Sequence, residues 1–352
     1  MCRGYHGMRP IFRMPPIFRR MRPIFRIVVF FLSLASTGVF SAGAQGRTGS
    51  PRPQFWGFTG PWESNSTRSV RDHGGALSAV INGWITIDSA SAQPVIPSPY
   101  PDTVHPRNGT PDRMAIVTSW HGEGFHVEPI RRLGRDPQRL ASAAGAIARY
   151  AAAMRYTGLV LDFEDLKPAD LPALLRVSRA IADSGHAHRV GTIAMAIPAT
   201  DTAAYPVRAL LGVVDAVIVM LYDQHWAESE PGPIAEPSWV RSSLALRVAE
   251  AGPGRIIAAL PAYGYRWRKG RPTDSISFEE ATRMASAARA PLQRDPASQF
   301  LRSRGRNGTE IWVSDATLLG TLVRESQALG VNRFAIWRLG QEDPAVWRSV
   351  IR

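Results

Sequence analysis

Short apolar runs alternate along the chain with longer stretches in which apolar residues recur every three or four positions. The run Ala216–Leu221 is apolar throughout, which is typical of a strand buried on both faces of a parallel sheet. Eight segments are predicted to be strands: Phe55–Thr59, Ala79–Asp88, Met114–Trp120, Gly158–Glu164, Val190–Ile197, Ala216–Tyr222, Arg255–Tyr263 and Arg333–Leu339. Five are predicted to be helices: Pro137–Met154, Leu171–Asp183, Pro206–Leu211, Ser238–Ala251 and Ala316–Leu329.

The order of these elements predicts an α/β fold. Eight strand–helix units in roughly 300 residues are typical of a (β/α)8 TIM barrel. A doubly wound sheet is the alternative, but the sequence has no glycine-rich phosphate loop after the first strand. Residues 266–315 break the alternation, because they are long, polar and arginine-rich. We interpret them as a small insertion between strands 7 and 8 of one barrel domain, residues 55–352.

The first 44 residues differ in composition from the rest of the chain. Seven arginines and no acid precede an apolar run over 27–40, and the small residues Ala42-Gly43-Ala44 follow it. This order is typical of a secretory signal peptide. The alternative is an uncleaved N-terminal anchor, although a membrane span needs about 20 apolar residues. We therefore expect an exported protein, periplasmic or extracellular, that touches a membrane only through this segment. Residues 45–54 are predicted to be a linker.

Composition narrows the function classes further. The chain of 352 residues is 45% hydrophobic and 20% charged, which is ordinary for a globular protein. Its net charge of +13 suggests a nucleic-acid partner. Without the first 44 residues, however, 35 basic residues stand against 29 acidic ones, so we expect none. Cys2 is the only cysteine, which excludes an internal disulfide and a cysteine-ligated metal. We expect no cofactor and no metal, and a monomer.

Two acidic side chains end the predicted fourth strand. Alternation along a strand puts Val160, Asp162 and Glu164 on one face. Active sites of such barrels lie at the carboxyl ends of the strands, so both carboxyl groups are expected in the barrel mouth. Like charges this close raise the pKa of one group, which suits a general acid. The alternative is a solvated strand end whose acids contact a helix N-terminus.

Further candidates lie at other predicted strand ends. Met220, Tyr222 and Asp223 end the sixth strand, and Trp337 lies at the end of the eighth. Aromatic faces stack on the C–H faces of sugars, so these positions favour a carbohydrate cleft. Other aromatic residues predicted to contact substrate are Trp62, Trp84, Trp226 and Tyr265, the last at the end of strand seven. Core or loop packing is the alternative for each of them.

These motifs resemble glycoside hydrolase family 18, the chitinase-like family. Its fourth-strand signature, Asp-Gly-x-Asp-x-Asp-x-Glu, aligns with 157–164, where Asp162 and Glu164 match and Thr157 and Val160 replace the first two acids. Its Met-x-Tyr-Asp signature and its strand-eight tryptophan are matched in full. The similarity covers about residues 55–351. It is strongest to a bacterial branch that includes spore-cortex peptidoglycan hydrolases and hydrolase modules fused to polysaccharide deacetylases and glycosyltransferases.

The resemblance implies an exported glycoside hydrolase of β-linked, N-acetylglucosamine-containing polysaccharide: chitin, peptidoglycan or an exopolysaccharide. The implied mechanism is substrate-assisted and retaining. Glu164 would be the acid and base, and Asp162 would hold the substrate's acetamido N–H. Tyr222 would bond the acetamido oxygen, Asp223 would contact the same sugar, and Trp337 would stack beneath it.

The departure at Val160 leaves Asp162 without the acidic neighbour that the family places below it. We expect Asp162 to find a partner near Thr192 or Met220, or to stay oriented toward Glu164. We also expect an active enzyme with a shifted pH profile or low turnover.

Two other functions stay open on the sequence. A non-catalytic carbohydrate-binding, chitinase-like barrel would keep the aromatic cleft without turnover. A metal-dependent polysaccharide deacetylase would use His121 and His126, but no aspartate stands at ligand spacing from them.

Overall fold

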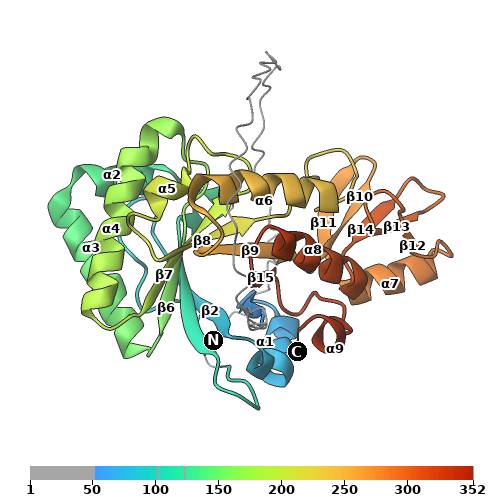
Figure 1. Cartoon of the computed structure of the whole chain (residues 1–352), viewed down its shortest axis with the longest axis horizontal. Helices are drawn as coiled ribbons and strands as arrows, with labels where there is room; N and C mark the ends of the chain where they lie inside the picture. The colour runs from blue at the N-terminus through green and yellow to red at the C-terminus, as the bar shows by residue number, and fades with distance from the viewer. Residues whose placement is uncertain (1–51, 101, 103, 123, 352) are drawn as a thin grey trace, which may run out of the picture.

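The computed structural model describes residues 52–100, 102, 104–122 and 124–351. Eight parallel strands form a closed barrel (Figure 1), which confirms the predicted fold class. In barrel order the strands are β1 (Gln54–Phe58), β15 (Arg333–Trp337), β9 (Ile256–Pro261), β8 (Ala216–Met220), β7 (Thr192–Pro198), β6 (Gly158–Asp162), β3 (Asp112–Thr118) and β2 (Ala79–Thr86). The predicted signal peptide or anchor and most of the predicted linker lie outside the described residues.

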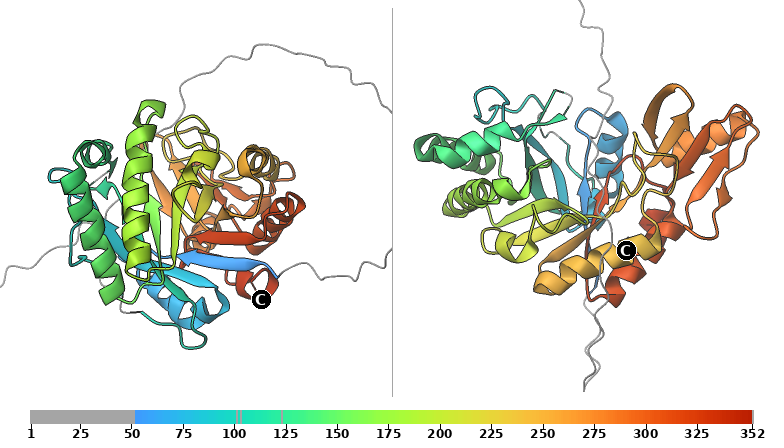
Figure 2. Two further views of the ribbon diagram at one scale, coloured as in Figure 1. Left: turned by 60° about the vertical axis from the view of Figure 1, so that its left-hand side comes forward. Right: turned by 90° about the horizontal axis from the view of Figure 1, so that it is seen from above.

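Helices surround the barrel and cover the outer faces of its strands (Figures 1 and 2). The helices of the described residues are α1 (Ser64–His73), α2 (Glu128–Arg135), α3 (Pro137–Ala153), α4 (Leu171–Ala187), α5 (Val207–Leu210), α6 (Pro237–Ala251), α7 (Phe278–Ala287), α8 (Ala316–Ala328) and α9 (Val346–Ser349). Of these, α7 packs on the insertion and not on the barrel. The five predicted helices correspond to α3, α4, α5, α6 and α8. The sequence pattern missed α1 and α2, because α1 is mostly polar and α2 has only two turns. No helix within the described part of the chain is long and apolar enough to cross a membrane.

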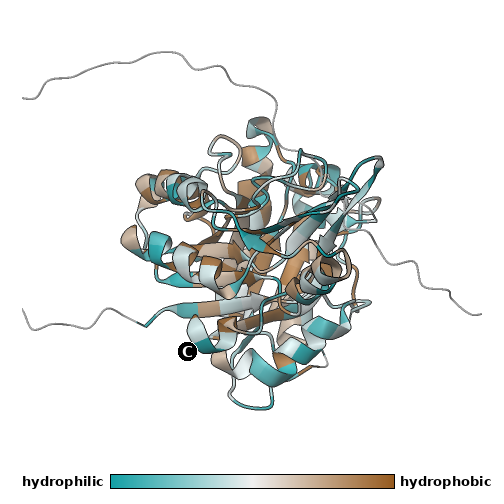
Figure 3. Cartoon of the chain, turned by 90° about the vertical axis from the view of Figure 1, so that its right-hand side faces the viewer, coloured by the Kyte–Doolittle hydropathy of each residue, from teal (hydrophilic) through white to brown (hydrophobic). Residues whose placement is uncertain are grey.

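Burial explains why the strands read as continuous apolar runs. Every residue of β2, β6 and β9 is buried, because each strand faces the barrel interior on one side and a helix on the other. In Figure 3 the barrel strands are coloured mostly hydrophobic, whereas the helices carry both hydrophobic and hydrophilic positions. One continuous core therefore holds the strands, and their carboxyl ends form a single rim.

The predicted insertion between strands seven and eight is an antiparallel sheet that carries α7. Its strand order is β11 (Arg271–Ile276), β10 (Gly264–Arg268), β14 (Glu310–Val313), β13 (Leu301–Arg304) and β12 (Gln293–Arg294). It lies beside the barrel (Figures 1 and 2). The sheet begins at Gly264, two residues before the predicted boundary, because the apolar pattern of β9 continues past the point where the chain leaves the barrel. A Cβ at Gly264 would lie 2.4 Å from the Trp312 carbonyl oxygen, so only glycine fits there.

Candidate active site

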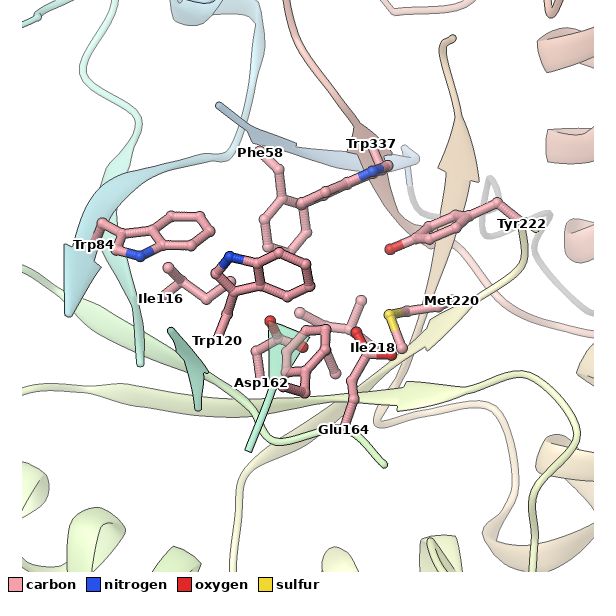
Figure 4. Close-up of a pocket in the computed structure, with 12 residues that line it drawn as sticks. Phe58, Trp84, Ile116, Trp120, Asp162, Glu164, Ile218, Met220, Tyr222 and Trp337 are labelled. Carbon is pink, nitrogen blue, oxygen red and sulfur yellow. The ribbon is translucent and has the colours of Figure 1, made fainter. Parts of the chain in front are cut away.

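A pocket of about 450 Å³ opens at the carboxyl ends of the barrel strands (Figure 4). Its two acidic groups are Asp162, the last residue of β6, and Glu164, two residues further on. The rest of the lining is aromatic or apolar: Phe58, Trp84, Ile116, Trp120, Phe125, Ala196, Ile218, Met220, Tyr222 and Trp337. The pocket therefore combines a polar centre with walls suited to sugar faces.

The two carboxyl groups line the same pocket, and each affects the pKa of the other. Burial raises the pKa of the Glu164 carboxyl well above its ordinary value, and the neighbouring charges of Asp162, Asp165 and Asp223 raise it further. Burial also raises the pKa of Asp162. A pair of this kind keeps one proton at neutral pH, which is what a general acid needs.

Asp162 finds its further partner on the neighbouring strand β3. The hydroxyl of Thr118 lies 3.2 Å from Asp162 Oδ2, and the Trp120 backbone N–H donates to the same hydroxyl at 3.0 Å. The Thr118 hydroxyl thus accepts one hydrogen bond from Trp120 and donates its single proton to Asp162. This hydrogen bond lowers the pKa of Asp162 against the effect of burial.

The expected partner of Asp162 near Thr192 is corrected by this geometry, whereas Met220 lines the same pocket as Asp162. Thr192 pairs with Gly158, the first residue of β6, so it lies at the opposite end of the strand from Asp162. Val160 is fully buried beneath Asp162 and pairs with Ile116, so no acid can reach the pair from below. The predicted orientation of Asp162 toward Glu164 is present, with Thr118 added at its side.

Tyr222 and Trp337 face the carboxyl pair across the pocket (Figure 4). Their rings are stacked, with centroids 6.1 Å apart and an interplanar angle of 15°. Both side chains are mostly buried, and the Tyr222 hydroxyl points into the pocket. Met220 and Trp84 complete the set of predicted residues that line it.

Asp223 lies one residue beyond Tyr222, outside the pocket lining. Its Oδ1 accepts hydrogen bonds from the hydroxyls of Tyr263 and Tyr265, the latter at 3.1 Å. Burial raises the pKa of Asp223 to about 6, and the two phenol hydrogen bonds act against this rise. Asp223 therefore ionises near neutral pH and is held from the side of the insertion.

Three predicted substrate contacts do not line this pocket. Tyr265 belongs to β10 of the insertion, not to the end of strand seven, and its hydroxyl binds Asp223. Trp62 packs edge-on against Trp84, with ring centroids 5.2 Å apart, and is not part of the pocket lining. Trp226 is half-buried on the loop after β8 and packs against the barrel core.

Sequence patterns missed Phe125 in the pocket wall, whereas Trp120 lies at the end of a predicted strand, Met114–Trp120. Trp120 and Phe125 come from a hairpin of two strands, β4 (Trp120–His121) and β5 (Gly124–Phe125), and their ring centroids are 5.1 Å apart. Strands of two residues carry no periodicity, so only the glycines of this segment signalled a turn. On the same hairpin, His121 Nδ1 pairs with Ser89 Oγ at 2.8 Å. Among the described residues, no group of three or more His, Cys, Asp or Glu side chains is placed to hold a metal ion.

No model of a known protein family matches the chain. A putative sporulation-specific glycosylase of Bacillus subtilis is 26% identical over 251 residues, which are 68% of this chain and 59% of that protein. The chain thus spans about six-tenths of the length of this curated relative.

Solved structures share the architecture. The spore cortex-lytic enzyme of Bacillus cereus superposes with a TM-score of 0.72 at 18% identity, over 85% of this chain and 74% of the other. A class V chitinase variant from Nicotiana tobaccum, solved in complex with NAG4, superposes with a TM-score of 0.69 at 14% identity, over 85% and 97% of the two chains.

Proposed function

We propose, from the premise that the chain has the chitinase-like fold of glycoside hydrolase family 18 and is related to sporulation-specific glycosylases, that it hydrolyses β-linked N-acetylglucosamine-containing polysaccharide. The observation that carries the proposal is the pair of carboxyl groups, Asp162 and Glu164, that line one aromatic pocket. Chitin, peptidoglycan glycan strands and an N-acetylglucosamine exopolysaccharide are the candidate polymers.

The proposed mechanism is substrate-assisted and retaining. Glu164 gives its proton to the glycosidic oxygen while the substrate's acetamido oxygen attacks the anomeric carbon, and the leaving sugar departs. Asp162 accepts the acetamido N–H and stabilises the positive charge of the oxazolinium intermediate. Glu164, now ionised, takes a proton from the water that opens this intermediate.

The aromatic residues and Asp223 supply binding in this mechanism. Trp337 stacks beneath the reacting sugar, and the Tyr222 hydroxyl, which points into the pocket, donates to the acetamido oxygen. Asp223 contacts the same sugar. The N-terminal signal, or anchor, delivers the barrel to the periplasm or the outside of the cell, where such polymers occur.

Mass-spectrometric product analysis on the three polymers tests the proposed function. We expect reducing-end oligosaccharides from at least one polymer with the wild-type protein. Glu164→Gln keeps the shape of the pocket but has no acid, so its rate should fall by at least about 10²-fold. A wild-type protein that binds these polymers but is no faster than Glu164→Gln would instead indicate a non-catalytic binding barrel.

A further inference from the structure

The loop that carries Glu164 turns sharply just after that residue. β6 ends at Asp162, so the Glu164 side chain is placed by loop backbone and not by a strand. The next residue, Asp165, has a φ of 61°, in the left-handed region that few residues other than glycine adopt. Such backbone persists only where surrounding contacts hold it.

One side chain supplies contacts on both sides of this turn. The Tyr205 hydroxyl donates to the Phe163 carbonyl oxygen at 2.8 Å and accepts from the Leu166 N–H at 3.2 Å. Tyr205 comes from the loop between β7 and α5 and is only 1% exposed. Its single hydroxyl therefore holds the chain just before and just after the segment formed by Glu164 and Asp165.

Tyr205 is itself anchored by a buried charge on α6. The Arg247 guanidinium is fully buried and donates to the carbonyl oxygens of Pro198, Ala199 and Tyr205 at 2.6, 3.0 and 3.0 Å. Glu250 balances its charge at 3.0 Å. A buried guanidinium is tolerated only when its donors are satisfied, so these bonds fix the Tyr205 loop in one arrangement.

We propose that Tyr205 is a positioning residue for Glu164: through its two backbone hydrogen bonds it holds the loop 163–166 so that the acid points into the pocket. Arg247 connects the Tyr205 loop to helix α6 through its hydrogen bonds. The inference rests on the proposed function, since it assigns Tyr205 to placing the general acid. The alternative is that Tyr205 serves only as a core residue.

Tyr205→Phe tests whether the Tyr205 hydroxyl holds the loop 163–166, because phenylalanine keeps the buried ring and loses only the hydroxyl. Amide hydrogen exchange over residues 163–167 should become faster, since Leu166 loses its acceptor, while exchange in β6 should stay unchanged. kcat should fall by about tenfold, because a misplaced acid is out of line with the glycosidic oxygen. KM should change less than about twofold, because the aromatic walls are untouched.

Tyr150→Phe is the matched control. Its hydroxyl also accepts from a backbone N–H, that of Ser98 at 3.3 Å, but on a loop with no contact to the carboxyl pair. It should leave kcat and exchange over 163–167 unchanged. Unchanged exchange in Tyr205→Phe, or faster exchange with an unchanged kcat, would overturn the proposal.

Arg247→Lys is the second variant, for use if Tyr205→Phe does not fold. A single ammonium cannot replace the guanidinium fork, so exchange over 163–167 should again become faster and kcat should fall, by less than in Tyr205→Phe. If a folded Arg247→Lys variant has unchanged exchange over 163–167 and an unchanged kcat, the proposal is contradicted. If the wild-type protein hydrolyses none of the polymers, the proposed function fails, while the exchange results still decide whether Tyr205 holds the loop.

Discussion

At the scale of single residues, the protonation of the carboxyl pair depends on which neighbour donates to Asp162. Val160 offers no polar atom from below, and Thr118 donates from the side. A donor at Asp162 favours its ionised form, so the shared proton resides on Glu164. The protein thus obtains an acid and an adjacent anion from two carboxyl groups and one hydroxyl.

Thr118→Val should shift the acidic limb of the kcat/KM profile to higher pH. Without the hydroxyl, the pKa of Asp162 rises, so the anion that the proposed mechanism needs forms only at a higher pH. Loss of a hydrogen bond to a charged group predicts a shift of about one pH unit. The measurement is kcat/KM on a soluble N-acetylglucosamine oligomer between pH 4 and pH 9.

Thr118→Ser retains the donor and should restore the wild-type profile. Thr59→Val controls for the loss of a buried threonine hydroxyl, because Thr59 Oγ1 donates to the Ile81 carbonyl at 3.3 Å and does not contact the pair. A profile of Thr118→Val that coincides with that of Thr59→Val would argue against the role of Thr118.

At the scale of elements, the insertion sheet contributes to the barrel's active site without lining its pocket. Tyr265 on β10 contacts Trp267 of the same strand and Tyr263, which lies just before the sheet, with ring centroids 5.3 and 5.4 Å away. The two tyrosine hydroxyls converge on Asp223. The sheet therefore positions the aspartate that follows Tyr222 and promotes its ionisation.

Tyr265→Phe should raise the pKa of Asp223 above its value of about 6, because one donor to the carboxylate is lost. As the solution is acidified, the variant should therefore lose any activity that depends on ionised Asp223 at a higher pH than the wild-type protein does. Tyr263→Phe should have the larger effect, since the hydrogen bond from Tyr263 lowers the pKa of Asp223 more than the one from Tyr265 does. The pH dependence of substrate binding by calorimetry measures both, and equal binding by all three proteins from pH 5 to pH 8 would refute this.

At the scale of the whole molecule, the buried acids oppose folding. Burial raises the pKa of Asp162 and Glu164, so the folded protein binds more protons than the unfolded chain above about pH 4. The free energy of unfolding consequently falls as the pH rises through the folded-state pKa values. The acid needed for catalysis thus lowers stability under the conditions where it works.

Glu164→Gln should therefore raise the melting temperature at pH 8. It should leave the melting temperature nearly unchanged at pH 4, where the Glu164 carboxyl group and the amide that replaces it are both uncharged in the folded protein. A gain of about 2–4 °C per kcal/mol is expected for a domain of this size. Differential scanning calorimetry at the two pH values measures it, with the exposed Glu228→Gln as control. An equal gain at both pH values would mean that packing and not ionisation is responsible.

The sequence by itself determined the barrel and the carboxyl pair. Continuous apolar runs demand burial on both faces, and alternation along the predicted fourth strand puts Asp162 and Glu164 on one face; both line the pocket, although β6 itself ends at Asp162. These are local properties of the chain, so a pattern of a few residues is enough to predict them.

Only the tertiary structure decided which groups surround the carboxyl pair. Trp120 and Phe125 reach the pocket from another segment, Thr118 reaches Asp162, and Tyr205 reaches the Glu164 loop from 39 residues or more away along the chain. Contacts between distant segments depend on strand register and loop path, which leave no periodic signal in the sequence.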